Sequence, residues 1–289
     1  MDKPPHGYKL VQLANGAYSV HSLAHGETFH PVIGPAAEAQ ALYVKQLRLA
    51  ERLRGHQGEF VVWDVGLGAA ANSLAVLQST CHLPSQLRLV SFDHTLEPLE
   101  FALRHAPQLA YFDGYEEMIG QLLAAGASPL HCQHGQQEVV WEVHLGDFPA
   151  LLESAKAAAF PKPHAILFDA YSPATNPAMW TQPLFHRLFE LLDPKRPCAL
   201  PTYSRSTLLR VTLLLAGFYV GIGEATGEKE ETTIAANVPE LISAPLDQRW
   251  LQRARNSTSA EPLWTPVYRQ ARLSNESWQR LNEHPQFRT

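Results

Sequence analysis

The chain has few cysteines, no long apolar run and no general excess of basic residues. Cys81, Cys132 and Cys198 stand far apart among 289 residues, and none forms a Cys-x-x-Cys pair, which argues against a disulfide framework. No apolar run approaches the ~20 residues that span a bilayer, and the first residues lack the charged-then-apolar build of a secretory signal. The sequence therefore predicts a cytoplasmic protein with reduced thiols and no membrane partner.

The formal net charge of -5 argues against a protein that coats nucleic acid through a general basic field. The charge is nevertheless uneven, because seven arginines stand against three glutamates from Arg249 onward. This tail also contains Trp250, Trp264, Tyr268 and Trp278, and cations interleaved with aromatic rings suit either a nucleic-acid edge or an ordinary helical tail.

With 45% hydrophobic residues, the chain can bury one large core. We expect an N-terminal hairpin and helix over 1–55, a main domain over 56–240 and an extension over 241–289. Asn15-Gly16 predicts a hairpin of Lys9–Ala14 with Ala17–Ala24, and apolar spacing predicts one helix over Ala36–Leu53. From Ser243 on, the composition predicts irregular or weakly helical structure.

From Phe60 short apolar runs alternate with helical stretches, which is typical of a mostly parallel sheet covered on both faces. The fold class is therefore α/β, Rossmann-like, with a seven-stranded sheet whose last two strands pair antiparallel. The expected strands are Phe60–Val65, Leu87–Asp93, Val139–Leu145, Ala165–Asp169, Cys198–Tyr203, Phe218–Glu224 and Glu231–Asn237. The expected helices are Ala70–Gln78, Leu96–Arg104, Glu116–Ala125, Pro149–Ala158, Pro177–Leu192 and Arg205–Ala216.

A strand followed by a glycine turn and a helix start is found at Phe60–Asn72. Glycine permits a sharp turn and a close ligand approach, and the helix start offers free N–H groups, so Gly66 and Gly68 are candidates for a nucleotide-binding turn. The segment also satisfies G-x-G-x-x-A, which keeps a dinucleotide cofactor open.

Acidic residues end the next two expected strands. Asp93 can accept hydrogen bonds from the ribose hydroxyls of an adenosine, or it can cap the helix that starts near Thr95. Asp147 can accept from the exocyclic amine of adenine and can also cap the helix at Pro149.

The fourth expected strand delivers Asp169-Ala170-Tyr171-Ser172-Pro173, followed by Asn176-Pro177 and Trp180-Thr181, at the edge where open α/β sheets bind ligands. This segment resembles the MnmC-type methyltransferase domain, which finishes 5-methylaminomethyl-2-thiouridine at the tRNA wobble position. The resemblance extends over about Gly26 to Asn237. It also includes Ala37-Glu38-Ala39, Tyr43-Val44, the glycine turn with Asn72, Phe92-Asp93, Gly146-Asp147 and Ala216-Gly217-Phe218.

The resemblance implies a Rossmann-like methyltransferase that moves a methyl group from S-adenosylmethionine to the aminomethyl nitrogen of a modified uridine, with tRNA as partner. Some members carry a fused flavin oxidoreductase domain, and this chain would look like the stand-alone form. Two features depart from the family. Ala70 replaces a third glycine, and the acidic segment Gly227–Glu231 replaces a basic one, which affects the RNA substrate more than the cofactor.

Methyl transfer needs an oriented, deprotonated amine, so Asp169 is the candidate to hold the amine or accept its proton, and Tyr171 would line the methyl channel. Capping and packing are the structural alternatives for these two residues. Glu38 could reach the methionine amino group or the substrate. The candidate cofactor-binding residues are Glu38, Gly66, Gly68, Asn72, Asp93, Asp147 and Asp169. The candidate substrate-binding residues are Tyr171, Pro173 and Tyr203.

His131-Cys132-Gln133-His134 lacks a clear fourth ligand, so we expect a solvated loop and no metal. No serine sits in Gly-x-Ser-x-Gly, which disfavours a hydrolase. Other functions stay open: a small-molecule methyltransferase, an aminopropyltransferase similar to spermidine synthase, a non-catalytic RNA- or protein-binding module and, least favoured, a dinucleotide oxidoreductase. The sequence leaves the oligomeric state undetermined.

Overall fold

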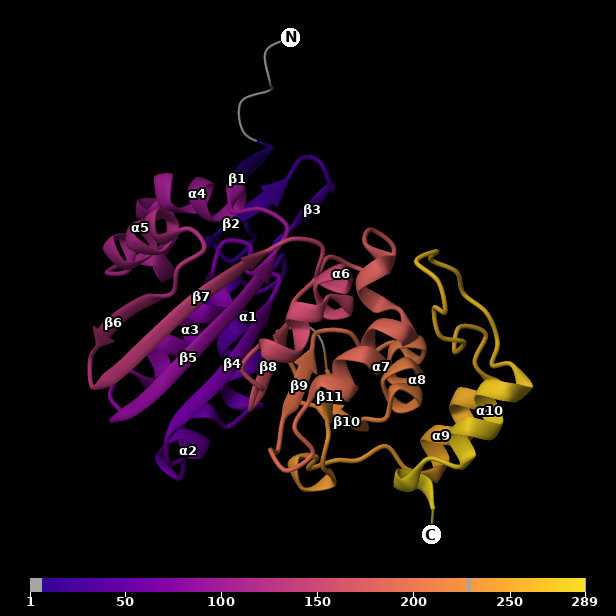
Figure 1. Cartoon of the computed structure of the whole chain (residues 1–289). Helices are drawn as coiled ribbons and strands as arrows, with labels where there is room; N and C mark the ends of the chain where they lie inside the picture. The colour runs from indigo at the N-terminus through magenta and orange to yellow at the C-terminus, as the bar shows by residue number, and fades with distance from the viewer. Residues whose placement is uncertain (1–6, 228–229, 289) are drawn as a thin grey trace.

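A computed structural model of the chain describes residues 7–227 and 230–288, and two sheets form its framework (Figure 1). The small antiparallel sheet contains the N-terminal strands β1 (Tyr8–Gln12), β2 (Tyr18–Ser22) and β3 (Glu27–Thr28). The large sheet has eight strands: β4 (Glu59–Val65), β5 (Ser85–Asp93), β6 (Leu130–His134), β7 (Gln137–Leu145), β8 (Ala165–Phe168), β9 (Ala199–Thr202), β10 (Tyr219–Gly223) and β11 (Thr232–Ala236).

The strand order of the large sheet is β10-β11-β9-β8-β4-β5-β7-β6. The five central strands run parallel, while β11, β10 and β6 are antiparallel to their neighbours. The chain proceeds from β4 to β5 on one side and later returns to β8 on the other side of β4. Open α/β sheets form their ligand crevice outside the carboxyl ends of the strands at such a reversal, so this topology places a site beside β4 and β8.

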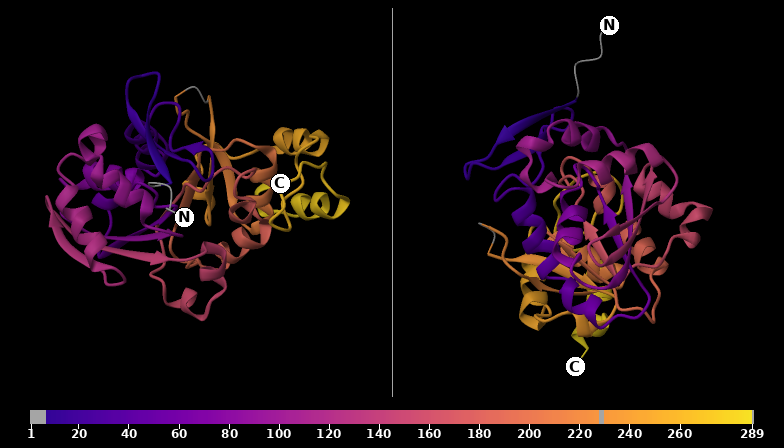
Figure 2. Two further views of the ribbon diagram at one scale, coloured as in Figure 1. Left: turned by 90° about the horizontal axis from the view of Figure 1, so that it is seen from above. Right: turned by 90° about the vertical axis from the view of Figure 1, so that its left-hand side faces the viewer.

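Helices cover both faces of the large sheet (Figures 1 and 2). Successive residues of β4 supply the two core layers: Trp63 packs with α6 (Phe148–Glu153), α7 (Gln182–Leu191) and α8 (Thr207–Ala216), whereas Val62 packs with the helices of the opposite face. That second layer contains α1 (Pro35–Ala39), α2 (Leu49–Arg54), α3 (Ala71–Thr80), α4 (Glu97–Arg104) and α5 (Glu116–Ala125). The predicted Rossmann-like α/β class is confirmed.

The sheet has one strand more than predicted. The segment from His131 to His134, expected as a solvated loop, belongs to β6 and pairs antiparallel with β7. Its polar residues His131 and Gln133 face solvent, while Leu130 and Cys132 are half-buried, so the strand forms a polar edge of the sheet. The predicted antiparallel pairing of the last two strands is confirmed by β10 and β11.

The expected continuous helix over Ala36–Leu53 is wrong. A π-helical turn at Gln40–Lys45 separates α1 from α2, and Arg48 adopts a left-handed φ of 50° before α2 begins. The π-helical turn buries Leu42, Tyr43 and Val44 in succession, and Tyr43 Oη donates to the Phe168 carbonyl at 3.0 Å. The interruption therefore ties this segment to the end of β8, beside the expected ligand crevice.

Two predicted helices are each divided into an α-helix and a 3-10 turn. The segment expected as one helix from Pro177 starts as a 3-10 turn over Pro177–Trp180, and α7 begins after the cap Thr181. Likewise, α6 ends at Glu153 and a 3-10 turn, Ala155–Ala159, follows it. In both cases a capping residue divides the apolar stretch into two shorter elements.

The C-terminal extension is more regular than expected. It contains α9 (Gln248–Asn256) and α10 (Asn275–Asn282), which lie on the outer side of α7 and α8 (Figures 1 and 2). The Arg255 guanidinium lies 4.8 Å from the Trp278 ring centroid, and that of Arg280 lies 5.5 Å from Trp264. These cation and ring pairs stabilise the extension itself. None of the helices in the described residues combines the length and apolarity needed to cross a bilayer.

Candidate active site

A cavity of about 850 Å³ opens at the carboxyl ends of β4, β5, β7 and β8, where the topology places a ligand crevice. This volume lies within the range of small-molecule sites. The structure brings nearly all of the predicted site residues to its wall, and Pro173 alone does not line it. The lining candidates are Glu38, Gly66, Gly68, Asn72, Asp93, Asp147, Asp169, Tyr171 and Tyr203.

The glycine turn after β4 forms the floor of the cavity. Gly66 has a φ of 93°, and a Cβ added to it would stand 2.7 Å from the Asp169 carbonyl oxygen. Its N–H donates to the Phe92 carbonyl at 2.9 Å, so the turn is fixed from both sides. Ala70, which replaces the family's third glycine, has a φ of 60° and keeps the left-handed conformation despite its side chain. The turn therefore keeps its backbone conformation with alanine at this position.

Asp93 lies at the end of β5 and is oriented by three backbone N–H groups. Gly68 donates to Oδ2 at 2.8 Å, while His94 and Thr95 donate to Oδ1 at 2.6 and 3.3 Å. Burial raises the pKa of Asp93, and these hydrogen bonds act in the opposite direction. A carboxylate has about four acceptor positions, so capacity remains for a ribose hydroxyl.

Asp147 follows β7 and is the N-cap of α6, because its side chain accepts from the Ala150 N–H at 3.1 Å. Capping, one of the two roles expected from the sequence, is thus present. Asp147 also lines the cavity, so the carboxylate is available at the adenine end that the sequence predicts.

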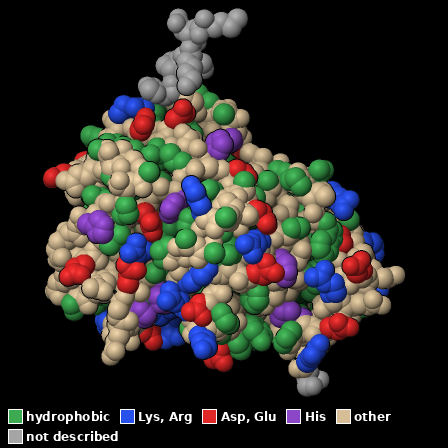
Figure 3. Space-filling view, viewed as in Figure 1, with side chains coloured by type: hydrophobic (Ala, Val, Ile, Leu, Met, Phe, Trp, Pro, Cys, Tyr) green, Lys and Arg blue, Asp and Glu red, His purple; other side chains and the backbone are tan. Residues whose placement is uncertain are grey.

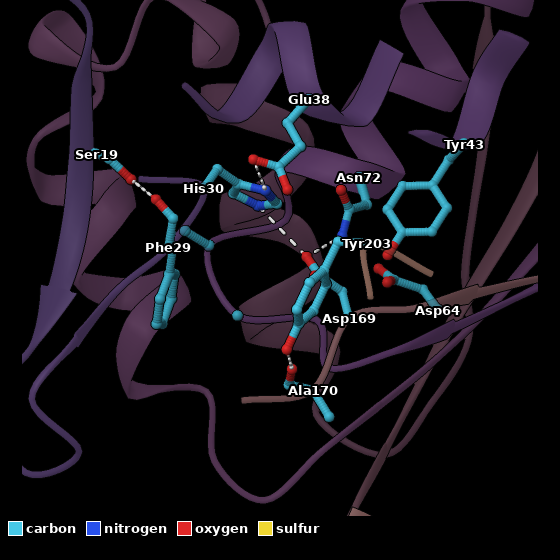
Figure 4. A network of polar contacts seen from close by, with 12 residues as sticks. Ser19, Phe29, His30, Glu38, Tyr43, Asp64, Asn72, Asp169, Ala170 and Tyr203 are labelled. Carbon is cyan, nitrogen blue, oxygen red and sulfur yellow. Dashed lines mark hydrogen bonds and ion pairs between the residues drawn. The ribbon is translucent and has the colours of Figure 1, made fainter. Parts of the chain in front are cut away.

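Asp169 is held by residues from two other elements (Figure 4). Asn72, from α3, donates from Nδ2 to Oδ2 at 2.8 Å, and His30 Nε2 lies 3.5 Å from the same oxygen. On the other side of the imidazole, His30 Nδ1 lies 4.0 Å from Glu38 Oε2. These four residues form a polar group at the wall of the cavity, in which Glu38 and Asn72 are buried and His30 and Asp169 are partly exposed.

The loop after β8 carries the aromatic wall. Tyr171 packs against His25 with ring centroids 4.3 Å apart and against Phe29 at 5.8 Å. Burial raises the pKa of the Tyr171 hydroxyl well above its ordinary value of 10, so the ring stays neutral. Tyr203 donates from its hydroxyl to the Ala170 carbonyl at 3.2 Å and supports the start of the same loop.

The sequence did not predict that the N-terminal segment with the small sheet forms part of the cavity wall. The residues that it contributes include His25, Glu27, Phe29 and His30. Ser172 donates to Glu27 from its hydroxyl at 2.6 Å and from its N–H at 3.3 Å, and the Thr175 hydroxyl donates to the same carboxylate. Burial alone would raise the pKa of Glu27, but these hydrogen bonds outweigh it and lower the pKa. Glu27 therefore clamps the loop after β8, from 145 residues away in the chain. The only sequence signal was that the family resemblance begins near Gly26.

Asp64 lies beneath the glycine turn and is fully buried. Burial raises its pKa to about 7, although the Ser73 hydroxyl donates to Oδ2 at 2.6 Å and acts against this rise. The nearby carboxylates of Asp169 and Asp93 add to it. Asp64 therefore gains a proton easily near neutral pH.

The ionisable side chains that line the cavity are mainly acidic. Among the described residues that line it there is no lysine or arginine. The acidic lining residues are Glu27, Glu38, Asp93, Asp147 and Asp169, and the histidines are His25, His30 and His94. Such a wall favours ligands with positive or amine groups over free phosphates.

Comparisons with known proteins agree with this geometry. A family described as S-adenosyl-L-methionine-dependent methyltransferase matches residues 111–238. The chain is 27% identical over 248 residues to "tRNA 5-methylaminomethyl-2-thiouridine biosynthesis bifunctional protein MnmC" of Methylibium petroleiphilum, covering 82% of this chain and 36% of that protein. It is 30% identical over 217 residues to the protein of the same description from Azoarcus sp., covering 73% of this chain and 33% of that protein.

Among solved structures, MnmC2 from Aquifex aeolicus shares the fold with a TM-score of 0.69 and 22% identity, over 98% of this chain and 85% of that one. The chain spans about a third of the length of the curated relatives it matches. Fold and family together define an S-adenosyl-L-methionine-dependent methyltransferase. Within that class the chain is similar to the MnmC proteins over most of its length. The cofactor expected from the sequence is confirmed.

The residues present fit this cofactor. The absence of a Cβ at Gly66 lets the turn pack directly against the Asp169 carbonyl at the cavity wall. Asn72 Oδ1 is buried without a hydrogen-bond partner among the described residues. Oxygen acceptors such as Asn72 Oδ1 and the carboxylate of Glu38 suit the ammonium group of a methionine moiety. Asp93 and Asp147 would hold the ribose and adenine ends.

Proposed function

We propose that this methyltransferase acts in the cytoplasm on the aminomethyl nitrogen of a modified wobble uridine in tRNA. The observation that carries the proposal is the acidic cavity without lysine or arginine among its described lining residues, with Asp169 next to the glycine turn. An amine acceptor matches this charge, and the names of the MnmC relatives support a thiouridine of tRNA as its carrier.

S-adenosylmethionine supplies an electrophilic methyl group on a sulfonium when it is bound. The chain itself must hold the acceptor nitrogen in line with that group, with its lone pair free. The acceptor nitrogen would form the new bond to the methyl carbon, while the carbon–sulfur bond would break and leave its electron pair on sulfur. Asp169 takes the proton that the methylated nitrogen loses, and it releases this proton to solvent.

The aromatic wall supports an amine acceptor as well. The faces of Tyr171 and Phe29 attract a positively charged group within about 6 Å. An alkylated nitrogen that gains charge during transfer would therefore be stabilised between this wall and the carboxylates of Glu27 and Asp169.

We infer that RNA would contact separate basic side chains and not one continuous basic surface. On the face shown in Figure 3, basic and acidic side chains are interspersed. Two residues of the acidic segment Gly227–Glu231 lie outside the described residues, but Glu231 Oε1 stands 3.1 Å from the buried guanidinium of Arg210. Since this ion pair neutralises Glu231 within the protein, that acid adds little repulsion toward a phosphate backbone.

The proposal is tested with labelled S-adenosylmethionine and undermethylated tRNA, followed by digestion to nucleosides. We expect the label in the methylaminomethyl uridine. Label in other nucleosides would refute the assignment of the nucleotide, and transfer only to free small molecules would refute the tRNA substrate. Selective binding of decarboxylated S-adenosylmethionine would indicate an aminopropyltransferase.

Asp169→Asn tests the proposed proton acceptor. We expect kcat to fall by about 10²- to 10⁴-fold, the usual contribution of a positioned acid or base, while the cofactor still binds. Asp113→Asn is the matched control, because Asp113 is exposed and lies outside the cavity. Full activity of the Asp169 variant would remove this residue from the mechanism.

A further inference from the structure

His30 lies between β3 and α1 in a conformation that non-glycine residues rarely adopt. Its φ is 48°, within the left-handed region, and its side chain is only 8% exposed. Strained residues of this kind persist where the surrounding structure holds them, and they concentrate at functional sites.

The small sheet holds this strained conformation in place. The N–H of Phe29, the residue before His30, donates to the Val20 carbonyl at 2.8 Å, and the Ser19 hydroxyl donates to the Phe29 carbonyl. Both groups of Phe29 are thus bonded to β2. The loop therefore presents the imidazole to the cavity in a fixed direction.

The imidazole lies between two carboxylates (Figure 4). Its Nε2 faces Asp169 Oδ2 at 3.5 Å and its Nδ1 faces Glu38 Oε2 at 4.0 Å. A carboxylate only accepts hydrogen bonds, so the ring must carry its donor on Nε2 in order to hold Asp169. Asn72 Nδ2 donates to the same oxygen at 2.8 Å. With Oδ2 approached by these two groups, Oδ1 remains the oxygen available to a ligand.

We propose that His30 is a positioning residue, which fixes the Asp169 carboxylate so that Oδ1 faces the acceptor nitrogen. This inference rests on the proposed function, since it gives Asp169 the role of proton acceptor. His30 itself does not touch the acceptor. It links the N-terminal sheet to the reacting centre and explains why the small sheet forms one wall of the site.

The test replaces His30 by glycine, which adopts a φ of 48° without strain and therefore removes the side chain with little effect on the backbone. Since a displacement of about 1 Å in a catalytic group costs about 10²-fold, we expect His30→Gly to lower kcat by about that factor, with unchanged affinity for the cofactor. Added imidazole should restore part of the lost kcat. The control is His82→Gly, because His82 is exposed and lies in the turn after α3.

A second readout does not depend on catalysis. In ¹⁵N-labelled protein the His30 Nε2–H correlation should be visible, protected from solvent exchange, and lost in Asp169→Ala. Wild-type kcat in His30→Gly would overturn the proposal, as would a loss of kcat that imidazole fails to restore and that accompanies a lower Tm. If the wild-type protein methylates no tRNA, the proposed function fails. The Nε2–H correlation then tests the proposed His30–Asp169 contact by itself, and its absence in the wild-type protein would refute the contact.

Discussion

The substitution Gly66→Ala tests whether the glycine turn shapes the methyl-transfer site. The added Cβ would meet the Asp169 carbonyl oxygen at 2.7 Å and its carbonyl carbon at 3.1 Å. Both are backbone atoms, so no flexible side chain can move aside. Either the turn or the end of β8 must shift, and Asp169 moves with it.

The expected magnitude follows from this contact. Relief of a 2.7 Å contact requires a displacement of about 0.5 Å, and since about 1 Å costs about 10²-fold in rate, we expect kcat to fall by about tenfold. The φ of 93° adds a conformational cost of about 1–2 kcal/mol to folding, because an L-residue is strained there. Cofactor affinity should fall as well.

Gly58→Ala separates these two effects. Gly58 has a φ of 83°, but a Cβ at this position meets nothing within 4 Å. It should therefore show the loss of Tm without the loss of kcat or of S-adenosylmethionine affinity, measured by calorimetry. If Gly66→Ala matches the Gly58 variant in both kcat and cofactor affinity, the turn and Asp169 do not form one site.

Three further predictions concern the clamp, the buried acid and the extension. Glu27→Gln should raise the KM for the tRNA acceptor. Because the pKa of Glu27 is lowered from 4.5, its hydrogen bonds to the loop after β8 stabilise the fold above that pH. The wild-type and variant melting curves should therefore converge toward acid pH. The pKa of Asp64 is raised from 3.8 to about 7. The free energy of unfolding should therefore fall by about 4 kcal/mol as the pH rises through this window. Asp64→Asn should flatten that dependence in denaturant titrations and be the more stable protein at alkaline pH. Leu281→Ala, at a fully buried position of α10, should cost about 2–5 kcal/mol with cofactor affinity unchanged; an unaltered Tm would show that the extension is not part of the core.

The elements that sequence patterns predicted well are those whose signal is local. The strand and turn of residues 60–68 carry an apolar run followed by glycines, and the structure forms β4 and the turn there. The edge strand β6 was missed because its exposed residues His131 and Gln133 resemble a polar loop, and its pairing with β7 is a tertiary effect. The π-helical turn before α2 likewise depends on the contact of Tyr43 with β8, which helical periodicity does not report.

In the candidate site, too, some residues have a local sequence signal and others depend on tertiary contacts. Asp93, Asp147 and Asp169 end strands, and parallel strands bring such ends together, so their convergence was predictable. Glu27 and His30 come from a short strand and a strained loop without a periodic pattern. Their roles arise from contacts with residues more than a hundred positions away, which only the folded chain reveals.

Backbone amide spectra recorded during titration with S-adenosylmethionine show whether one crevice binds the methyl donor across four strand ends. We expect the resonances of five residues to shift together with a single affinity: Gly66, Gly68, Asp93, Asp147 and Asp169. Shifts confined to another part of the molecule, or no shift at saturating donor, would contradict it.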